Sequence, residues 1–216
     1  MNAFNITIAI CNFKQKKWIH RCLRSLADQT IGSGKFEIIV VNDDPDDDLT
    51  AIIKSWSDIM NIRLFNNDVN IGLPASLNVA LENSRGRYFF RVDADDYISK
   101  HTLYVLSLFL DMNRDYQAVA CDYNEVDNLG KTLARKHSED DPIACGIMFT
   151  YESLCDVGFY DKTYKMREGH ELLKRYVKRH NIYYMPMPFY RYRKHNDNRT
   201  NDIANVAIYD ERLQRA

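Results

Sequence analysis

Short apolar runs alternate with helix-like segments over the first hundred residues, and this alternation constrains the possible folds most strongly. The runs are rich in β-branched and aromatic residues, as buried strands are, and they occupy residues 5–11, 36–42, 62–67 and 87–92. The segments between them carry apolar residues at helical spacing, such as Trp18, Cys22 and Leu26. This alternation predicts an α/β fold with a mainly parallel sheet covered by helices on both faces.

Beyond residue 99 the alternation stops, and the pattern predicts a smaller antiparallel portion. Residues 103–110 are apolar almost all round, which favours a helix packed inside the protein. We further expect a hairpin formed by residues 118–126 and 130–136, a strand at residues 142–149 and a helix at about residues 168–180. In the extended segment that follows, Pro186 and Pro188 exclude a central position in a hydrogen-bonded ladder.

The chain has 216 residues, of which 45% are hydrophobic, enough for one substantial core but short for two full domains. We expect a single domain over residues 1–203 and a C-terminal tail over 204–216. Within the domain, the change of pattern separates a first half, residues 1–98, from a second half, residues 99–203.

The five cysteines are odd in number and widely spaced, which favours reduced thiols and a reducing compartment over a disulfide frame or a zinc site. The sequence has neither a basic leader nor an apolar stretch of membrane-spanning length, so we expect a cytoplasmic protein. Residues 162–199 hold eleven Lys and Arg against three Asp and Glu, although the net charge is only −1. This segment is either a solvated face or a surface that attracts a phosphate-bearing ligand or the inner face of a membrane. Nothing indicates a nucleic-acid partner.

Two acidic clusters follow strand-like runs. Asp43 comes directly after the second run, and Asp93, Asp95 and Asp96 come after the fourth. Ligands of parallel α/β sheets bind beyond the carboxyl ends of the strands, and crowded carboxylates favour a hard cation such as Mg²⁺ or Mn²⁺. Because no glycine-rich phosphate loop is present, the pattern predicts a metal that holds a diphosphate. The alternative for Asp95 is an N-cap of a helix beginning near Ser99.

Seven segments together carry a family resemblance. They are ITIAICNFKQKKWIHRCLRSLADQT, EIIVVNDDPDDD, NIGLPASLN, RVDADDYI, DPIACGIMF, YKMREGHELLKRY and FYRYRKHNDNRT. In this order, over about residues 5–200, they resemble family 2 glycosyltransferases of the bacterial polysaccharide type, which have the Rossmann-like GT-A fold. The resemblance implies an inverting glycosyltransferase that uses a nucleotide-diphosphate sugar and Mn²⁺ or Mg²⁺. Its first half would bind the nucleotide sugar, and its second half would bind a glycan or lipid-linked acceptor.

The resemblance also assigns roles to residues of the first half. Cys11 and Phe13 would touch the base or the ribose, and Asp43 would hydrogen-bond the base. Asp93 would lie near the ribose and diphosphate, and Asp95 would be a metal ligand. Core packing is the alternative for Cys11 and Phe13, and turn formation before Pro45 is the alternative for Asp43.

The general base of the family is carried by a Glu-Asp motif, and here the sequence departs from the pattern. Gly169 stands where the basic aspartate is usually found, so either Glu168 or Glu171 would deprotonate the acceptor. Glu168 is the first choice. The alternative is that both are acids of a first helical turn, favoured by the helix dipole.

In the basic segment, His195 would lie against the metal or the diphosphate. Arg193 would bind the diphosphate, together with other nearby cations, Arg191, Lys194 and Arg199. Exposed, solvated positions are the alternative for each of these side chains.

Two other functions remain open at this stage. One is a catalytically inactive protein that binds a nucleotide sugar or a carbohydrate, which the glycine at position 169 would explain. The other is a sugar nucleotidyltransferase, although the sequence CNFKQKKW lacks the glycines of its phosphate loop. A phosphatase would need an aspartate pair after the first strand, where Cys11 and Asn12 stand.

Overall fold

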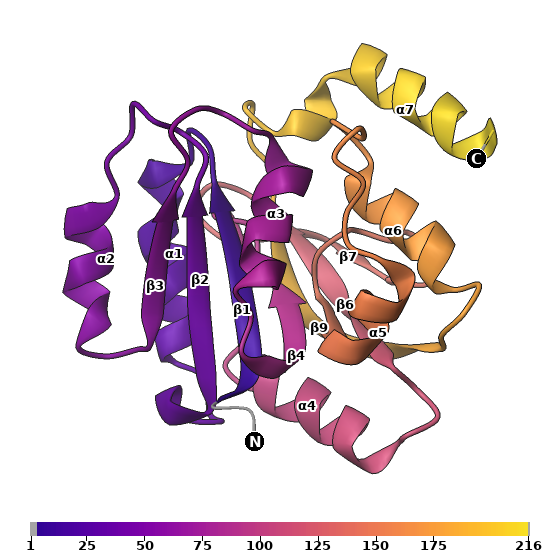
Figure 1. Ribbon diagram of the computed structural model, residues 1–216, viewed down its shortest axis with the longest axis horizontal. Helices are drawn as coiled ribbons and strands as arrows, with labels where there is room; N and C mark the ends of the chain where they lie inside the picture. Colours follow the sequence, from indigo (N-terminus) through magenta and orange to yellow (C-terminus); the bar gives the residue numbers. More distant parts are fainter. Residues whose placement is uncertain (1–3, 216) are drawn as a thin grey trace.

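The computed structural model describes residues 4–215, which form one mixed sheet with helices on both faces (Figure 1). The strands are β1 (Phe4–Asn12), β2 (Phe36–Asn42), β3 (Ile62–Asn66), β4 (Gly86–Arg91), β5 (Tyr97–Ile98), β6 (Ala118–Val126), β7 (Thr132–Lys136), β8 (Ile147–Thr150) and β9 (Ile182–Arg193). The helices are α1 (Lys16–Ala27), α2 (Thr50–Ser57), α3 (Leu73–Glu82), α4 (Thr102–Met112), α5 (Tyr151–Val157), α6 (Glu168–Tyr176) and α7 (Ile203–Arg215), with short 3₁₀ turns η1 (Ser33–Lys35) and η2 (Arg199–Asn201).

The first half of the chain builds the parallel part of the sheet. The strand order is β3-β2-β1-β4-β8-β6-β9-β5, with β7 paired to β6 outside this path. The first four strands in this order run parallel, and Ile8 at the centre of β1 pairs with Ile38 on one side and Phe90 on the other. The predicted α/β fold with a mainly parallel, doubly covered first half is therefore confirmed.

Alternation along the buried strands supplies both faces of the core. In β1, Ile6, Ile8 and Ile10 belong to one apolar cluster together with the inner faces of α1 and α4. Ala9 belongs to a second cluster, on the other face, with α3, α5 and α6. Because both faces are covered, these strands read as almost continuous apolar runs.

The second half extends the sheet with antiparallel pairs of β8 with β4 and β6 and of β7 with β6, whereas β9 runs parallel to β6. The predicted hairpin is confirmed, since β6 pairs antiparallel with β7 around the turn after Val126. The predicted strand over 142–149 is too long, because β8 begins only at Ile147, after Gly146 with a φ of 72°. The predicted helix over 168–180 is also too long, because α6 ends at Tyr176.

Strand β9 meets the expectation about its prolines locally, although the strand as a whole is not at the edge of the sheet. It lies inside the sheet, parallel to β6 on one side and antiparallel to β5 on the other. The ladder shifts register where Cys121 pairs with Met185 but Asp122 already pairs with Pro188. Pro186 therefore falls in a bulge, and β5 covers the other side only at Tyr190 and Arg191.

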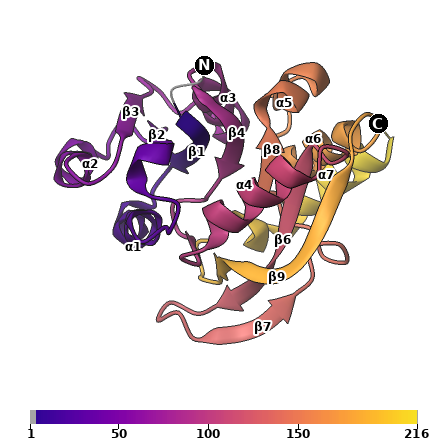
Figure 2. The ribbon, with the colours of Figure 1, turned by 90° about the horizontal axis from the view of Figure 1, so that it is seen from below.

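The apolar composition of α4 predicted a helix packed inside the protein, and this prediction is wrong. Leu103, Leu106 and Leu110 are buried, whereas Tyr104 and Leu108 are 47% and 40% exposed. The helix therefore lies on the sheet with one face in solvent. Figure 2 shows it alongside β6 and β9.

The segment that we expected to be a tail forms α7. With 13 residues it is the longest described helix, about 20 Å at 1.5 Å per residue. None of the helices between residues 4 and 215 has the length and apolar character needed to traverse a bilayer.

A buried polar cluster joins the amino ends of the parallel strands. Glu37 accepts hydrogen bonds from the Thr7 hydroxyl (2.7 Å) and the Arg85 amide (2.7 Å), and pairs with Arg63 (2.8 Å). Glu37→Ala is expected to lower the free energy of unfolding by about 3 kcal/mol, because it leaves the buried Thr7 hydroxyl without its acceptor and takes one partner from Arg63 and from the Arg85 amide. Urea denaturation would measure this loss. Glu37→Gln keeps an acceptor and should cost less than half as much; equal losses would contradict this account.

Candidate active site

The residues singled out in the sequence meet at the carboxyl ends of β1, β2 and β4. Asn12 pairs with Asn42 and Cys11 with Val41 at the ends of β1 and β2, and the Asp43 amide donates to the Asn12 carbonyl (2.8 Å), so Asp43 lies directly beyond the end of β1. Strand β4 lies on the other side of β1, and Asp93 follows its last residues. The two acidic clusters therefore flank the end of β1.

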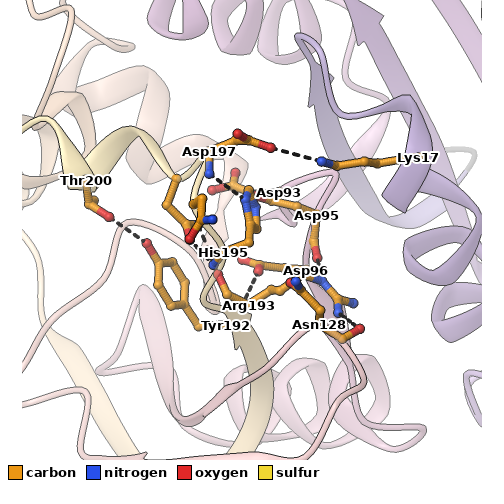
Figure 3. A network of polar contacts seen from close by, with 12 residues as sticks. Lys17, Asp93, Asp95, Asp96, Asn128, Tyr192, Arg193, His195, Asp197 and Thr200 are labelled. Atoms are coloured by element: carbon orange, nitrogen blue, oxygen red, sulfur yellow. Dashed lines mark hydrogen bonds and ion pairs between the residues drawn. The ribbon is translucent and has the colours of Figure 1, made fainter.

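The loop that carries Asp93, Asp95 and Asp96 is held by the end of β9 (Figure 3). Asp96 is buried and accepts hydrogen bonds from the Tyr190 hydroxyl (2.8 Å) and the Arg193 amide (2.7 Å). Burial, reinforced by the neighbouring carboxylates, raises the pKa of Asp96 well above its usual value. Asp96 therefore fixes the loop from inside.

Asp95 lies against His195, which comes from the loop after β9 (Figure 3). The Nε2 atom of His195 is 2.8 Å from Oδ2 of Asp95, and the histidine side chain is only 3% exposed. The Asp197 amide donates to Nδ1 (3.2 Å), so the neutral ring carries its proton on Nε2 and donates it to Asp95. The exposed position considered for His195 is thus wrong. The capping alternative for Asp95 is wrong too, since α4 begins at Thr102.

Arg91 links Asp93 to the start of α6. Its guanidinium contacts both carboxylate oxygens of Asp93 (2.7 and 3.1 Å) and Oε1 of Glu168 (3.0 Å). Burial alone would raise the pKa of Asp93, but the Arg91 charge and the hydrogen bond from the Cys145 thiol outweigh it and lower that pKa. Glu168 is thereby brought into the same charged group as Asp93.

Glu171 lies outside this group. Both of its oxygens are taken by Arg175 one turn further along α6, at 2.5 and 2.8 Å. Arg175 also donates to the carbonyls of Val157, Gly158 and Phe159, where it ends α5. The two candidate bases are therefore separated by the structure: Glu168 faces the acidic loop, and Glu171 supports the α5–α6 connection.

Gly169 is required by close packing. A Cβ atom at this position would lie 2.2 Å from Cβ of Ala144, in the loop before β8. Real Cβ atoms do not approach one another so closely, so an aspartate in this backbone position would collide with the loop. The close approach of Ala144 therefore explains why the carboxylate of the family motif is missing at this position.

Arg193 is not placed where a diphosphate could contact it. Its side chain is fully buried, with Nε donating to the Asp95 carbonyl (2.7 Å) and Nη1 to the Asn128 carbonyl (2.9 Å). The guanidinium stacks over Trp18 of α1, 4.3 Å from the ring centroid. Arg193 thus holds the acidic loop, the β6–β7 turn and α1 together, which corrects the expectation of a direct diphosphate contact.

Two residues at the end of β1 differ in burial. Cys11 is half-buried and packs against the second core cluster, and burial raises the pKa of its thiol, so the thiol stays protonated. Phe13 is 43% exposed, which excludes core packing for this ring. A base or ribose contact for both remains a prediction.

Asp43 anchors the loop before α3. One oxygen accepts from the Asn67 side chain (2.8 Å) and the Ile71 amide (2.8 Å), and the other accepts from the Gly72 amide (2.9 Å). It is buried and closes a long loop rather than a local turn before Pro45. A hydrogen bond to a base remains a prediction.

Asp95 and His195 offer a carboxylate oxygen and a ring nitrogen to a divalent cation, which would replace the Nε2 proton that His195 donates to Asp95. Burial and the charge of Asp93 raise the pKa of Asp95, so a cation beside it would relieve the crowding of like charges. A second cluster, Asp93, Asp96 and Cys145, has ligand atoms within 4.8 Å of one another. It fits less well, because burial raises the Cys145 pKa, the thiol is a hydrogen-bond donor, and Arg91 neutralises Asp93.

Comparison with protein families decides the classification. Residues 7–206 match the model of Glycosyl transferase family 2. The chain belongs to this family. A family 2 relative, the poly(ribitol-phosphate) beta-N-acetylglucosaminyltransferase TarS of Staphylococcus aureus (strain Mu50), is 32% identical over 106 residues, 49% of this chain and 18% of TarS. EpsH of Bacillus subtilis (strain 168) is 25% identical over 214 residues, 96% of this chain and 60% of EpsH.

Solved structures have the same fold. The TarS 1-349 structure in complex with UDP-GlcNAc matches with a TM-score of 0.79 at 21% identity, over 92% of this chain and 61% of that one. The mannosyltransferase PcManGT of Pyrobaculum calidifontis, in complex with GDP-Man and Mn²⁺, matches with a TM-score of 0.74 at 17% identity, over 94% and 61%. The fold is therefore GT-A-like, and the chain spans less than two thirds of each of these relatives.

Sequence reasoning missed Arg91 and Tyr190, which organise the site. A signal for Arg91 was present: it is a charged residue inside the apolar run RYFFRV, directly before an acidic cluster. A buried charge needs a partner of opposite charge, and the acidic cluster begins only two residues further along the sequence, at Asp93. Tyr190 carried no such signal, because its run contains several aromatic residues of the same appearance.

Proposed function

We propose that this chain transfers a sugar from a nucleotide-diphosphate sugar to an acceptor hydroxyl, with inversion at the anomeric carbon. The observation that carries the proposal is the group formed by Asp93, Asp95, His195 and Glu168 at the carboxyl ends of the parallel strands. Family membership supports it and removes the reason to consider a sugar nucleotidyltransferase. The names of relatives such as TarS support an acceptor among bacterial cell-surface polymers.

The chain's own residues would perform the proton transfer and the positioning. Glu168 takes the proton of the acceptor hydroxyl as its oxygen bonds to the anomeric carbon, and the nucleoside diphosphate leaves from the opposite face. Arg91 holds Glu168 and Asp93 in one arrangement, and Asp95 and His195 would hold a divalent cation. When bound, Mn²⁺ or Mg²⁺ neutralises the negative charge that develops on the diphosphate.

The second candidate is a nucleotide-sugar or carbohydrate binder without turnover. Gly169 favours it, because no carboxylate can stand at that position beside Ala144. The two candidates differ in transfer or donor hydrolysis in the presence of Mn²⁺, which the binder would not show. Cytoplasmic location and peripheral attachment to a membrane remain predictions.

Asp95→Ala is expected to abolish metal-dependent stabilisation by the nucleotide. For the unchanged protein, UDP or GDP with Mn²⁺ at a hundred times the Kd should add roughly 2.7 kcal/mol, or roughly 8 °C in melting temperature. A thermal-shift screen of nucleoside diphosphates with Mn²⁺ and with EDTA measures this. Asp140→Ala, an exposed acid, is the control and should keep the full shift. A full shift in Asp95→Ala would refute the metal site.

A further inference from the structure

A pocket beside the start of α6 lies outside the acidic loop. Its volume is about 260 Å³, and its walls are Lys165, Met166, Arg199, Asp202, Asn205 and Tyr209. Lys165 precedes Glu168 by three residues, a span of at most about 10 Å. A group bound at Lys165 would therefore lie near the start of the helix that carries Glu168.

Two cations of this pocket have no acidic partner. Arg199 donates a hydrogen bond to the backbone carbonyl of Lys165, which brings the two residues together. Neighbouring ion pairs join Arg167 to Asp210, Lys194 to Glu125 and Lys17 to Asp197, and no ion pair among residues 4–215 includes Lys165 or Arg199. The lining thus holds two cations outside any ion pair and one carboxylate, Asp202, so its balance is positive and attracts an anion, and arginine suits the oxygens of a phosphate.

The opposite wall has the groups that bind hydroxyls. Helix α7 contributes the Asn205 amide and the Tyr209 phenol. Asp202, just before α7, accepts a hydrogen bond from the Asn205 side chain (2.6 Å). The hydrogen bonds from Asn205 lower the pKa of Asp202, so this carboxyl group is ionised. Carboxylate, amide and phenol groups are the usual partners of polyol hydroxyls. The pocket therefore combines one end for a negative charge with one for hydroxyl groups.

Polar contacts with the loop before α6 hold helix α7 in place. Arg167 forms a two-point ion pair with Asp210 (2.7 and 3.0 Å), and the Arg212 guanidinium lies 4.0 Å from the Tyr164 ring centroid. No residue of α7 is buried, so the core does not require this helix. Figure 1 shows α7 on the same side of the molecule as α6. These contacts keep the pocket-lining residues of α7, Asn205 and Tyr209, in place.

We propose that this pocket binds a phosphorylated polyol or sugar that belongs to the acceptor. The assignment to the acceptor rests on the proposed glycosyl transfer. The phosphate lies between Lys165 and Arg199, and the hydroxyls face Asp202 and Asn205. The residues of α7 thus belong to the acceptor site rather than to a tail.

Glycerol 3-phosphate, titrated into the full chain by calorimetry, tests the pocket. Arg199→Gln and Lys165→Gln are each expected to weaken its binding about tenfold, since each removes one charge-assisted contact. Glycerol without phosphate should bind much more weakly. Lys178→Gln, which removes an exposed cation elsewhere, is the matched control and should bind as the unchanged chain does. No binding by the unchanged chain, or binding by both variants as tight as that of the unchanged chain, would overturn the proposal.

Two further measurements separate the explanations. Stabilisation by UDP or GDP with Mn²⁺ should be unchanged in Lys165→Gln; its absence from the unchanged chain would refute the proposed function while the phosphate result stood. Sedimentation with phosphatidylglycerol vesicles forms the other arm. Vesicle binding that requires Lys165 and Arg199, without binding of glycerol 3-phosphate, would overturn the acceptor pocket in favour of a membrane surface.

Discussion

Glu168→Gln is expected to lower the rate of sugar transfer about a thousandfold, the usual contribution of a positioned general base. The amide oxygen of glutamine can still accept the hydrogen bond from Arg91 (3.0 Å to Glu168), so the arrangement of the site is kept while the base is lost. Single-turnover transfer with a radiolabelled donor measures the rate, and the thermal shift with UDP or GDP and Mn²⁺ should be unchanged.

Glu171→Gln is the matched control, because the same substitution is made three residues away on the same helix. It removes the ion pair with Arg175, so a small loss of stability is expected with transfer close to that of the unchanged chain. A Glu168→Gln protein that retains more than a tenth of the rate would show that another group is the base. If the unchanged chain binds the nucleotide but transfers nothing, the inactive binder is correct.

Gly169→Ala is expected to destabilise the protein by about 3 kcal/mol, because a well-packed interior cannot absorb an added methyl group without displacement. The new Cβ would lie 2.2 Å from Cβ of Ala144. The melting temperature should fall by roughly 10 °C in a chain of this size. Thermal and urea denaturation measure both quantities.

The double variant Gly169→Ala with Ala144→Gly tests the cause of this loss. Removing the Ala144 side chain takes away the nearest atom, although its Cα would still lie 3.0 Å from the added methyl group. More than half of the lost stability should return, and Ala144→Gly alone should cost about 1 kcal/mol. Losses that simply add, with a coupling energy below about 0.5 kcal/mol, would contradict the direct clash.

This packing also bears on the choice of the base. An aspartate at position 169 would need more room than an alanine, and Ala144 leaves none. The family resemblance pointed to this position, and the sequence left Glu168 and Glu171 as alternatives. The structure separates them through their partners, because Glu168 contacts Arg91 at the end of β4 and Glu171 contacts Arg175 within α6.

Most of the first half of the fold could be predicted because its signals are local. Buried parallel strands are apolar runs, and the residues that end them are neighbours in the sequence, so the positions of Asp43 and Asp93 followed from the pattern. The second half was harder. Composition alone predicted that α4 is buried all round. Tyr104 and Leu108 are exposed because only one face of the helix packs against the sheet.

The sequence by itself determined the parallel half of the sheet, the acidic residues at its carboxyl edge and the family, since each depends on short-range patterns or on their order. Only the tertiary structure decided that Glu168 joins Arg91, 77 residues away, and that His195 joins Asp95, 100 residues away. It also buried Arg193 behind the acidic loop. Such contacts depend on how separate elements pack, and neither periodicity nor residue type encodes the distance between side chains so far apart in the chain.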